Sequence, residues 1–406
     1  MKKILVLFAC LSILIFGAAC STTEMSDFTP QEDVYLEINE QEPNNQPTED
    51  VIYKEPDYAN CQIVIYTVDD PDDEYYCIVE SVINEYAINA IHIAIPEDYS
   101  EIIFANHLEL IEREHIKAVI LDQSVPGLIE LMSQIKGRFP DILTIISTKH
   151  DINGVIGVAD MVLSVDVFNM GKKMVEQAQR MGAKAFVYYT YFNRPNIVVF
   201  DRELYKNTFK EACLEIGIEY VELEVPDFAK SPYYSTYYEP LIKILGSYNN
   251  DVCFFSDLCS MQIYLISTIS NIGGYYAQPC HPSLYHGFQY GLGIVSSDEN
   301  PIGIDFNRQI EEIKSTLTER GSIGHFSTWK ISFALISTVA AIEYSTNYCE
   351  GNIRGKADLE AMRECFQRAM EIYNSADTGF ELTQHPDYPN CFLFTEDYIV
   401  LQGNRE

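Results

Sequence analysis

Short apolar runs alternate with helix-length segments between Lys117 and Tyr191, and each run stops at polar residues. The runs are KAVIL at 117–121, ILTIIS at 142–147, MVLSV at 161–165 and AFVYY at 185–189. Continuous apolar runs of this length, rich in Val and Ile, are typical of parallel strands covered by helices on both faces. Ligands bind beyond the carboxyl ends of such strands. The pattern therefore predicts an α/β protein whose functional edge is formed by the residues that follow its strands.

The alternation extends in both directions and divides into two series that meet near Asp166. Further strands are expected at 63–68, 90–96, 219–226 and 252–256, a buried helix at 329–345 and a terminal hairpin at 392–401. We interpret the two series as two doubly wound parallel-sheet lobes joined by a hinge. The expected first lobe is 61–166 with a return at about 288–345, and the second is 167–287 with about 346–406.

The first 60 residues differ in composition from the rest of the chain. Lys2 and Lys3 precede an apolar run that ends in Gly-Ala-Ala-Cys at 17–20. This order is typical of a secretion signal, and it resembles a bacterial lipoprotein signal cleaved before a lipidated Cys20. Ordinary secretion with a free Cys20 is the alternative. Residues 21–60 are polar and acidic, which predicts a disordered tether between a membrane anchor and a globular body.

Acidic residues outnumber basic residues by more than two to one. The chain has 60 Asp and Glu against 27 Lys and Arg, a formal charge of −33. Removal of Lys2 and Lys3 with the signal leaves 25 basic residues and a charge of 25 − 60 = −35. A surface of this sign repels phosphate backbones, so we expect no nucleic acid partner.

Six segments carry a resemblance to a known family. They are DQSVPG at 122–127, FPDILTIISTKH at 139–150, ADMVLSVD at 159–166, RMGAKAFVYYTY at 180–191, QPCHPSLYHGF at 278–288 and GHFSTW at 324–329. Together they resemble the bacterial lipoprotein family catalogued as domain of unknown function 3798 (DUF3798). The segment at 149–151 departs from it, because no Pro precedes His150. The resemblance implies the fold of type I periplasmic solute-binding proteins and a binding role, without implying a particular ligand.

The candidate ligand contacts are polar and aromatic residues. Most of them follow the predicted strands, and the others lie in later segments that return between the lobes. Carboxylates and hydroxyl groups bind polar ligands, and aromatic rings stack on sugars or bases, so a sugar or nucleoside fits better than a phosphate or a carboxylate. Asp and Ser after strands are also common helix caps, and for any single residue capping is an equally good interpretation. The predicted contacts are Asp69, Ser124, His150, Asp166, Tyr191, Asp257, Tyr285 and Trp329.

The Pro-rich loop at 278–287 offers other chemistry. Cys280, His281, His286 and the nearby Cys259 match no zinc spacing, so we expect neither a metal nor a cofactor. A disulfide between Cys259 and Cys280 is a hypothesis, because both border strands of the second lobe. A thiol-dependent hydrolase is an alternative. However, sequence neighbours such as Cys280 and His281 rarely point at each other, and no nucleophile elbow, phosphate loop or HExxH motif occurs.

The sequence therefore predicts a lipid-anchored binding protein on the extracytoplasmic face of the membrane. Its lobes are expected to close on a small polar ligand, which a transporter permease or a sensor then recognises. The alternatives are a surface thiol-dependent hydrolase and a structural envelope lipoprotein that binds nothing. The ligand, the membrane partner, the disulfide pattern, the oligomeric state and the placement of 346–406 are left open.

Overall fold

The computed structural model describes most of the chain from residue 62 onward. The described residues are 62–68, 74–86, 90–95, 101–122, 126–148, 152–191, 202–226, 234–279, 287–294, 306–353, 355–373 and 379–403. They belong to one compact unit, Pro56–Glu406. The predicted signal with Cys20 and the predicted tether at 21–60 lie outside the described residues.

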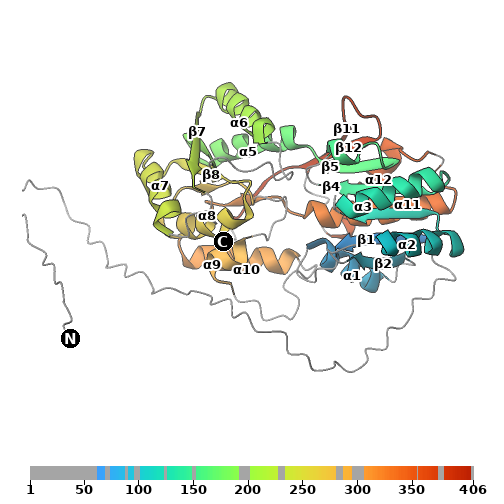
Figure 1. Ribbon diagram of the computed structural model, residues 1–406. Helices are drawn as coiled ribbons and strands as arrows, with labels where there is room; N and C mark the ends of the chain where they lie inside the picture. Colours follow the sequence, from blue (N-terminus) through green and yellow to red (C-terminus); the bar gives the residue numbers. More distant parts are fainter. Residues whose placement is uncertain are drawn as a thin grey trace, which may run out of the picture. The chain divides into compact units, whose positions relative to one another are not determined.

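The first lobe is built on a seven-stranded sheet with the order β11-β12-β5-β4-β3-β1-β2 (Figure 1). Neighbouring strands are parallel except β11 and β12, which are antiparallel. The strands are β1 (Ile63–Val68), β2 (Ala90–Ile95), β3 (Ala118–Asp122), β4 (Leu143–Thr148), β5 (Met161–Val165), β11 (Phe380–Gln384) and β12 (Cys391–Glu396).

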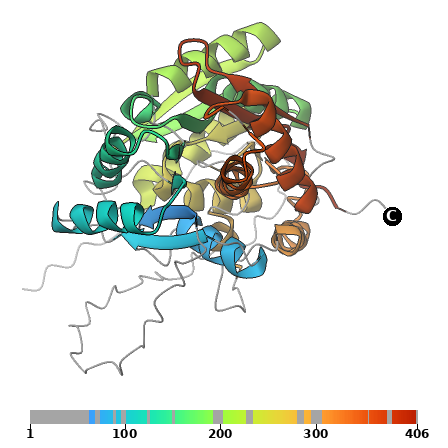
Figure 2. The same ribbon diagram turned by 90° about the vertical axis from the view of Figure 1, so that its right-hand side faces the viewer.

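Helices cover both faces of this sheet because successive strand residues point to opposite sides. Ile63 and Ile65 pack with α1 (Glu74–Tyr86), α11 (Phe333–Cys349) and α12 (Leu359–Ile372). Val64 and Tyr66 pack with α2 (Glu101–Arg113), α3 (Pro126–Arg138) and α4 (Ile152–Val155). Figure 2, in which this lobe faces the viewer, shows α11 and α12 together. Strands buried on both faces explain why they read as continuous apolar runs.

The second lobe contains a parallel sheet with the order β7-β6-β8-β9. Its strands are β6 (Ala185–Tyr191), β7 (Glu219–Val225), β8 (Val252–Phe255) and β9 (Tyr275–Tyr276). One face packs on α5 (Val167–Met181) and α6 (Arg202–Ile216). The other packs on α7 (Tyr234–Ser247), α8 (Cys259–Ile272), α9 (Phe288–Leu292) and α10 (Phe306–Glu319). A bridge from Tyr276 to Phe326 leads to the short pair β10 (Ser327–Thr328) and β13 (Ile399–Val400).

Three connecting segments join the lobes, and we call them the crossover segments. They are residue 166 between β5 and α5, residues 329–332 between β10 and α11, and residues 397–398 between β12 and β13. The first lies beside β12, the strand that leads into the third, because the Asp166 N–H donates to the Phe394 carbonyl at 2.8 Å. Two α/β lobes with parallel sheets confirm the predicted fold class.

The distribution of the later segments between the lobes differs from the expectation. Residues 288–319 were expected to return to the first lobe, but α9 and α10 pack in the second, against α8 and β6. Residues 346–406 were expected in the second lobe, but α12, β11 and β12 complete the first, and only β13 returns. Periodicity identifies an element but not its packing partner, because partner choice is set by contacts distant in sequence.

Two predicted elements were also wrong, one in its pairing and one in its start. The predicted terminal hairpin at 392–401 does not form, since β12 pairs with β5 and β11, whereas β13 pairs with β10 in the other lobe. The buried helix predicted from residue 329 begins at Phe333. Ser332 before it is extended, with φ −72° and ψ 134°, because the chain is still crossing between the lobes there.

Candidate functional site

The carboxyl ends of both sheets lie at the crossover segments. In the first lobe, β5 leads directly into Asp166, and β12 ends at Glu396. In the second lobe, Gln278 follows β9, and its side chain contacts the hydroxyl of Tyr398 in the third crossover segment. The same hydroxyl donates to the Met170 carbonyl on α5 at 3.4 Å. Polar groups from strand ends in both lobes therefore gather in one region, as expected for a site of this fold.

Asp166 is 6% exposed and caps α5. Its carboxylate accepts hydrogen bonds from the Asn169 backbone N–H at 3.0 Å and from Asn169 Nδ2 at 2.6 Å. A carboxylate at a helix N-terminus satisfies free N–H groups and interacts favourably with the helix dipole. The structure therefore gives Asp166 the capping role, and its ligand contact stays a prediction.

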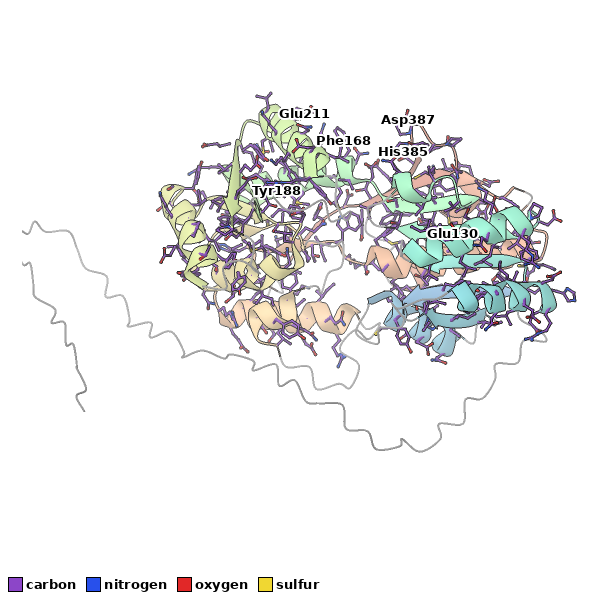
Figure 3. All side chains as sticks on the ribbon, viewed as in Figure 1. Glu130, Phe168, Tyr188, Glu211, His385 and Asp387 are labelled. Atoms are coloured by element: carbon purple, nitrogen blue, oxygen red, sulfur yellow. The ribbon has the colours of Figure 1, made fainter. Side chains whose placement is uncertain are left out.

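Asp257 follows β8 and is 1% exposed. Its carboxylate lies against the hydroxyl of Tyr188, a β6 residue in the interior of the second lobe (Figure 3). Burial raises the pKa of Tyr188 well above its usual range, and the charge of Asp257 raises it further, whereas Arg202 opposes the shift. Tyr188 thus remains a neutral donor beside a buried carboxylate, and Arg202 supplies the nearby positive charge.

Trp329 is fully buried in the second crossover segment. Its ring packs edge-on against Phe394, with centroids 5.7 Å apart, and lies 6.4 Å from the ring of Tyr398. Its indole nitrogen faces the hydroxyl of Tyr398. These contacts are those of a core residue that fixes the crossover segments, and stacking of Trp329 on a ligand stays a prediction.

The remaining predicted contacts are placed only in part. Tyr191 is the last residue of β6, in register with Val225 of β7. Asp69, Ser124, His150 and Tyr285 lie outside the described residues, as does the 280–286 part of the Pro-rich loop with Cys280. The proposed Cys259–Cys280 disulfide is therefore untested.

Sequence reasoning missed Arg202, the first residue of α6. Its Nη2 is paired with Glu222 Oε1 at 3.4 Å and with Glu224, while its buried Nε has no hydrogen-bond partner among the described residues. The sequence did contain a signal for a paired cation, because Glu222 and Glu224 are two residues apart and share one face of β7. Thr190, near the end of β6, is fully buried, and its hydroxyl has no hydrogen-bond partner in the described chain.

Sequence reasoning also missed Glu396, the last residue of β12. It is fully buried, and burial raises the pKa of its carboxyl group well above the usual range. No strong local signal marks it, since Glu396 lies in the segment that was interpreted as a hairpin turn.

The described residues contain no group of three His, Cys, Asp or Glu side chains arranged to hold a metal ion. Cys77, Cys213, Cys253, Cys365 and Cys391 are buried. Burial raises the pKa of Cys213, Cys365 and Cys391 to about 12, which makes these thiols poor nucleophiles. Within the described ranges, none of the helices has the length and hydropathy needed to span a bilayer.

Two parallel α/β lobes, three crossover segments and polar strand ends between them define the type I periplasmic-binding-protein fold class. Within that class, the chain belongs to the family described as "Protein of unknown function (DUF3798)", whose model matches residues 60–327. The family resemblance expected from the sequence is confirmed.

Individual relatives are distant. An uncharacterized protein of Treponema pallidum (strain Nichols) is 25% identical over 175 residues, which is 41% of this chain and 79% of that protein. A crystal structure from Clostridium difficile 630, provisionally described as a transcriptional regulator, has a TM-score of 0.70 at 17% identity, covering 84% of this chain and 99% of that one. An ABC transporter solute-binding protein from Burkholderia graminis C4D1M, crystallised with D-arabinose, has a TM-score of 0.43 at 11% identity, covering 74% and 92%.

Proposed function

We propose that the protein is a lipid-anchored, extracytoplasmic solute-binding protein that closes on a small polar ligand and presents it to a membrane transporter or sensor. The observation that carries this proposal is the gathering of polar strand ends from both lobes at the crossover segments. Binding drives closure when a ligand contacts both lobes only in the closed arrangement.

The charges at the strand ends favour a neutral ligand rich in hydroxyl groups. Asp166 and Asp257 are buried carboxylates, and Arg202 is already paired with two glutamates. An anionic ligand would have to approach these two carboxylates, while the charge of Arg202 is already shared by two glutamates. Hydroxyl groups of a sugar or nucleoside can donate to Asp257. They can also accept from Arg202 Nε and from the Thr190 hydroxyl, two groups without a hydrogen-bond partner among the described residues.

Calorimetric titration of the compact unit Pro56–Glu406 against pools of sugars, nucleosides and amino acids tests the proposal. We expect saturable binding of one neutral ligand per chain. Asp257→Ala and Arg202→Ala should each weaken it at least about tenfold, the effect of one lost charge-assisted hydrogen bond. Glu211→Gln, an exposed change further along α6, is the control. Undiminished affinity in both alanine variants would contradict the assignment of this site.

The anchor needs its own test. Cys20 should be labelled by palmitate in growing cells and should hold the protein in the membrane fraction. Cys20→Ser should abolish both, whereas Cys10→Ser, inside the apolar run of the signal, should abolish neither. A soluble, secreted wild-type protein would favour ordinary secretion instead.

A further inference from the structure

Glu396 occupies an unusual position between two crossover segments. It ends β12 and directly precedes the third segment, while the backbone N–H groups of Lys330 and Ile331 in the second segment face its carboxyl group. The side chain is fully buried, and these two backbone N–H groups offset only part of the effect of burial on its carboxyl group. An ionised carboxylate left in this state would carry a large desolvation cost.

The charged and titratable groups facing Glu396 do not offset that cost. Lys330 is attractive, whereas Asp397 is repulsive, and the neighbouring Tyr398 is itself fully buried. Asp397 is engaged by Lys173 of α5, whose Nζ lies 2.9 Å from its Oδ1 and 3.1 Å from Glu381 Oε1. Burial is the largest influence on Glu396, so the pKa of its carboxyl group is raised and the group holds a proton in this arrangement.

The protonation of Glu396 is coupled to the arrangement of the lobes by the connectivity of the chain. Any rotation of one lobe against the other must change the backbone of the crossover segments, because all three connect the lobes. Separation of Lys330 and Ile331 from Glu396 would admit water to the carboxyl group. Its pKa would then return toward that of an exposed glutamate, about 4.3.

We propose that Glu396 is a proton-dependent switch of the hinge, protonated when the second and third crossover segments pack as described here and ionised when they separate. The packed arrangement is therefore favoured at low pH and loses stability as the pH rises through the raised pKa of Glu396. One consequence of this inference rests on the proposed function. If a ligand binds only the packed arrangement, the protein takes up at most one proton, at Glu396, when the ligand binds.

The test measures the lobes directly and needs no ligand. Donor and acceptor dyes are attached through unnatural amino acids at Glu130 of α3 and Glu211 of α6, which are exposed residues in different lobes (Figure 3). The full chain is titrated from pH 5 to pH 9. For a single linked proton, we expect the ratio of the two energy-transfer populations to change by up to about tenfold per pH unit between the two pKa values of Glu396.

Two variants identify the responsible group. Glu396→Gln is isosteric with the protonated acid, so it should keep the low-pH population at every pH and lose the infrared C=O band of a protonated carboxyl group. Glu381→Gln removes an exposed carboxylate of the Lys173 network that does not face Glu396, and it should respond as the wild type does. A pH response that survives in Glu396→Gln, or a wild type without any response or carboxyl band, would overturn the proposal while leaving the ligand titration unaffected.

Discussion

Gly171 permits the closest contact between α5 and α6, the helices that begin at the candidate site. A Cβ atom at this position would lie 2.7 Å from Thr208 Cγ2 and 3.3 Å from Phe209 Cε1. Ordinary contacts of this kind are 3.4–4 Å, so α5 would have to shift by several tenths of an ångström. Such overpacking costs about 1–3 kcal/mol, against which alanine gains about 1 kcal/mol of helix propensity over glycine. We therefore expect Gly171→Ala to lower the free energy of unfolding by up to about 2 kcal/mol.

Urea denaturation followed by the fluorescence of Trp329, the single tryptophan, measures this change. Gly137→Ala is the matched control, because a Cβ there meets nothing within 4 Å, and it should leave stability unchanged or raise it by up to about 1 kcal/mol. Thr208→Ser removes the clashing methyl group, so the double variant should recover part of the loss. If Gly171→Ala is as stable as Gly137→Ala, the close packing of α5 on α6 is not a constraint and the reasoning is refuted.

Three further changes test single interactions. Asp166→Ala should lower the free energy of thermal unfolding by about 1 kcal/mol, because the α5 cap is lost. Asp166→Asn should lower it by less than about 0.5 kcal/mol, since asparagine caps equally well. Equal losses in the two variants would show that the charge of Asp166 matters instead of its capping hydrogen bond. The hydrogen bond from His92 lowers the pKa of Glu80, so Glu80→Gln should be less stable at pH 7, by under about 1 kcal/mol for this half-exposed group. In a denaturation series, that difference should disappear as the pH falls through the lowered pKa of Glu80, because the carboxyl group becomes protonated there. Lys356→Met removes three hydrogen bonds from Nζ, to Pro140 O at 2.6 Å, Ile142 O at 2.7 Å and Asp160 Oδ2 at 3.0 Å, and should cost about 2–3 kcal/mol by calorimetry.

Most of the sheet was predictable because burial on both faces leaves a strong local signal. The expected strands at 63–68 and 161–165 match β1 and β5 residue for residue. The C-terminal part was not predictable in the same way. Its strand β12 lies between β5 and β11, and the pairing of Cys391 with Val162 joins residues more than two hundred positions apart. No local pattern contains that information.

The residues of the candidate site were likewise predictable only in part. A residue that follows a strand can be identified from the sequence, and so Asp257 was expected and does lie at the end of β8. Arg202 begins a helix, and its role depends on two glutamates of β7 that come near only in the folded chain. Glu396 lies in a segment that resembles a turn, and only the course of the chain between the lobes makes it a buried group.

The three buried carboxyl groups at the strand ends differ in how their charge is accommodated, and the difference assigns them different roles. Asp166 is satisfied by the first turn of α5, which uses its hydrogen-bonding capacity locally. Asp257 lies beside the hydroxyl of Tyr188, with the positive charge of Arg202 nearby, and is the carboxyl group proposed to accept a ligand hydroxyl group. Glu396 has no comparable partner and is neutralised by a proton instead. A neutral ligand held by Asp257 and a proton held by Glu396 then favour the same packed arrangement, because neither adds an uncompensated charge to the region where the lobes meet.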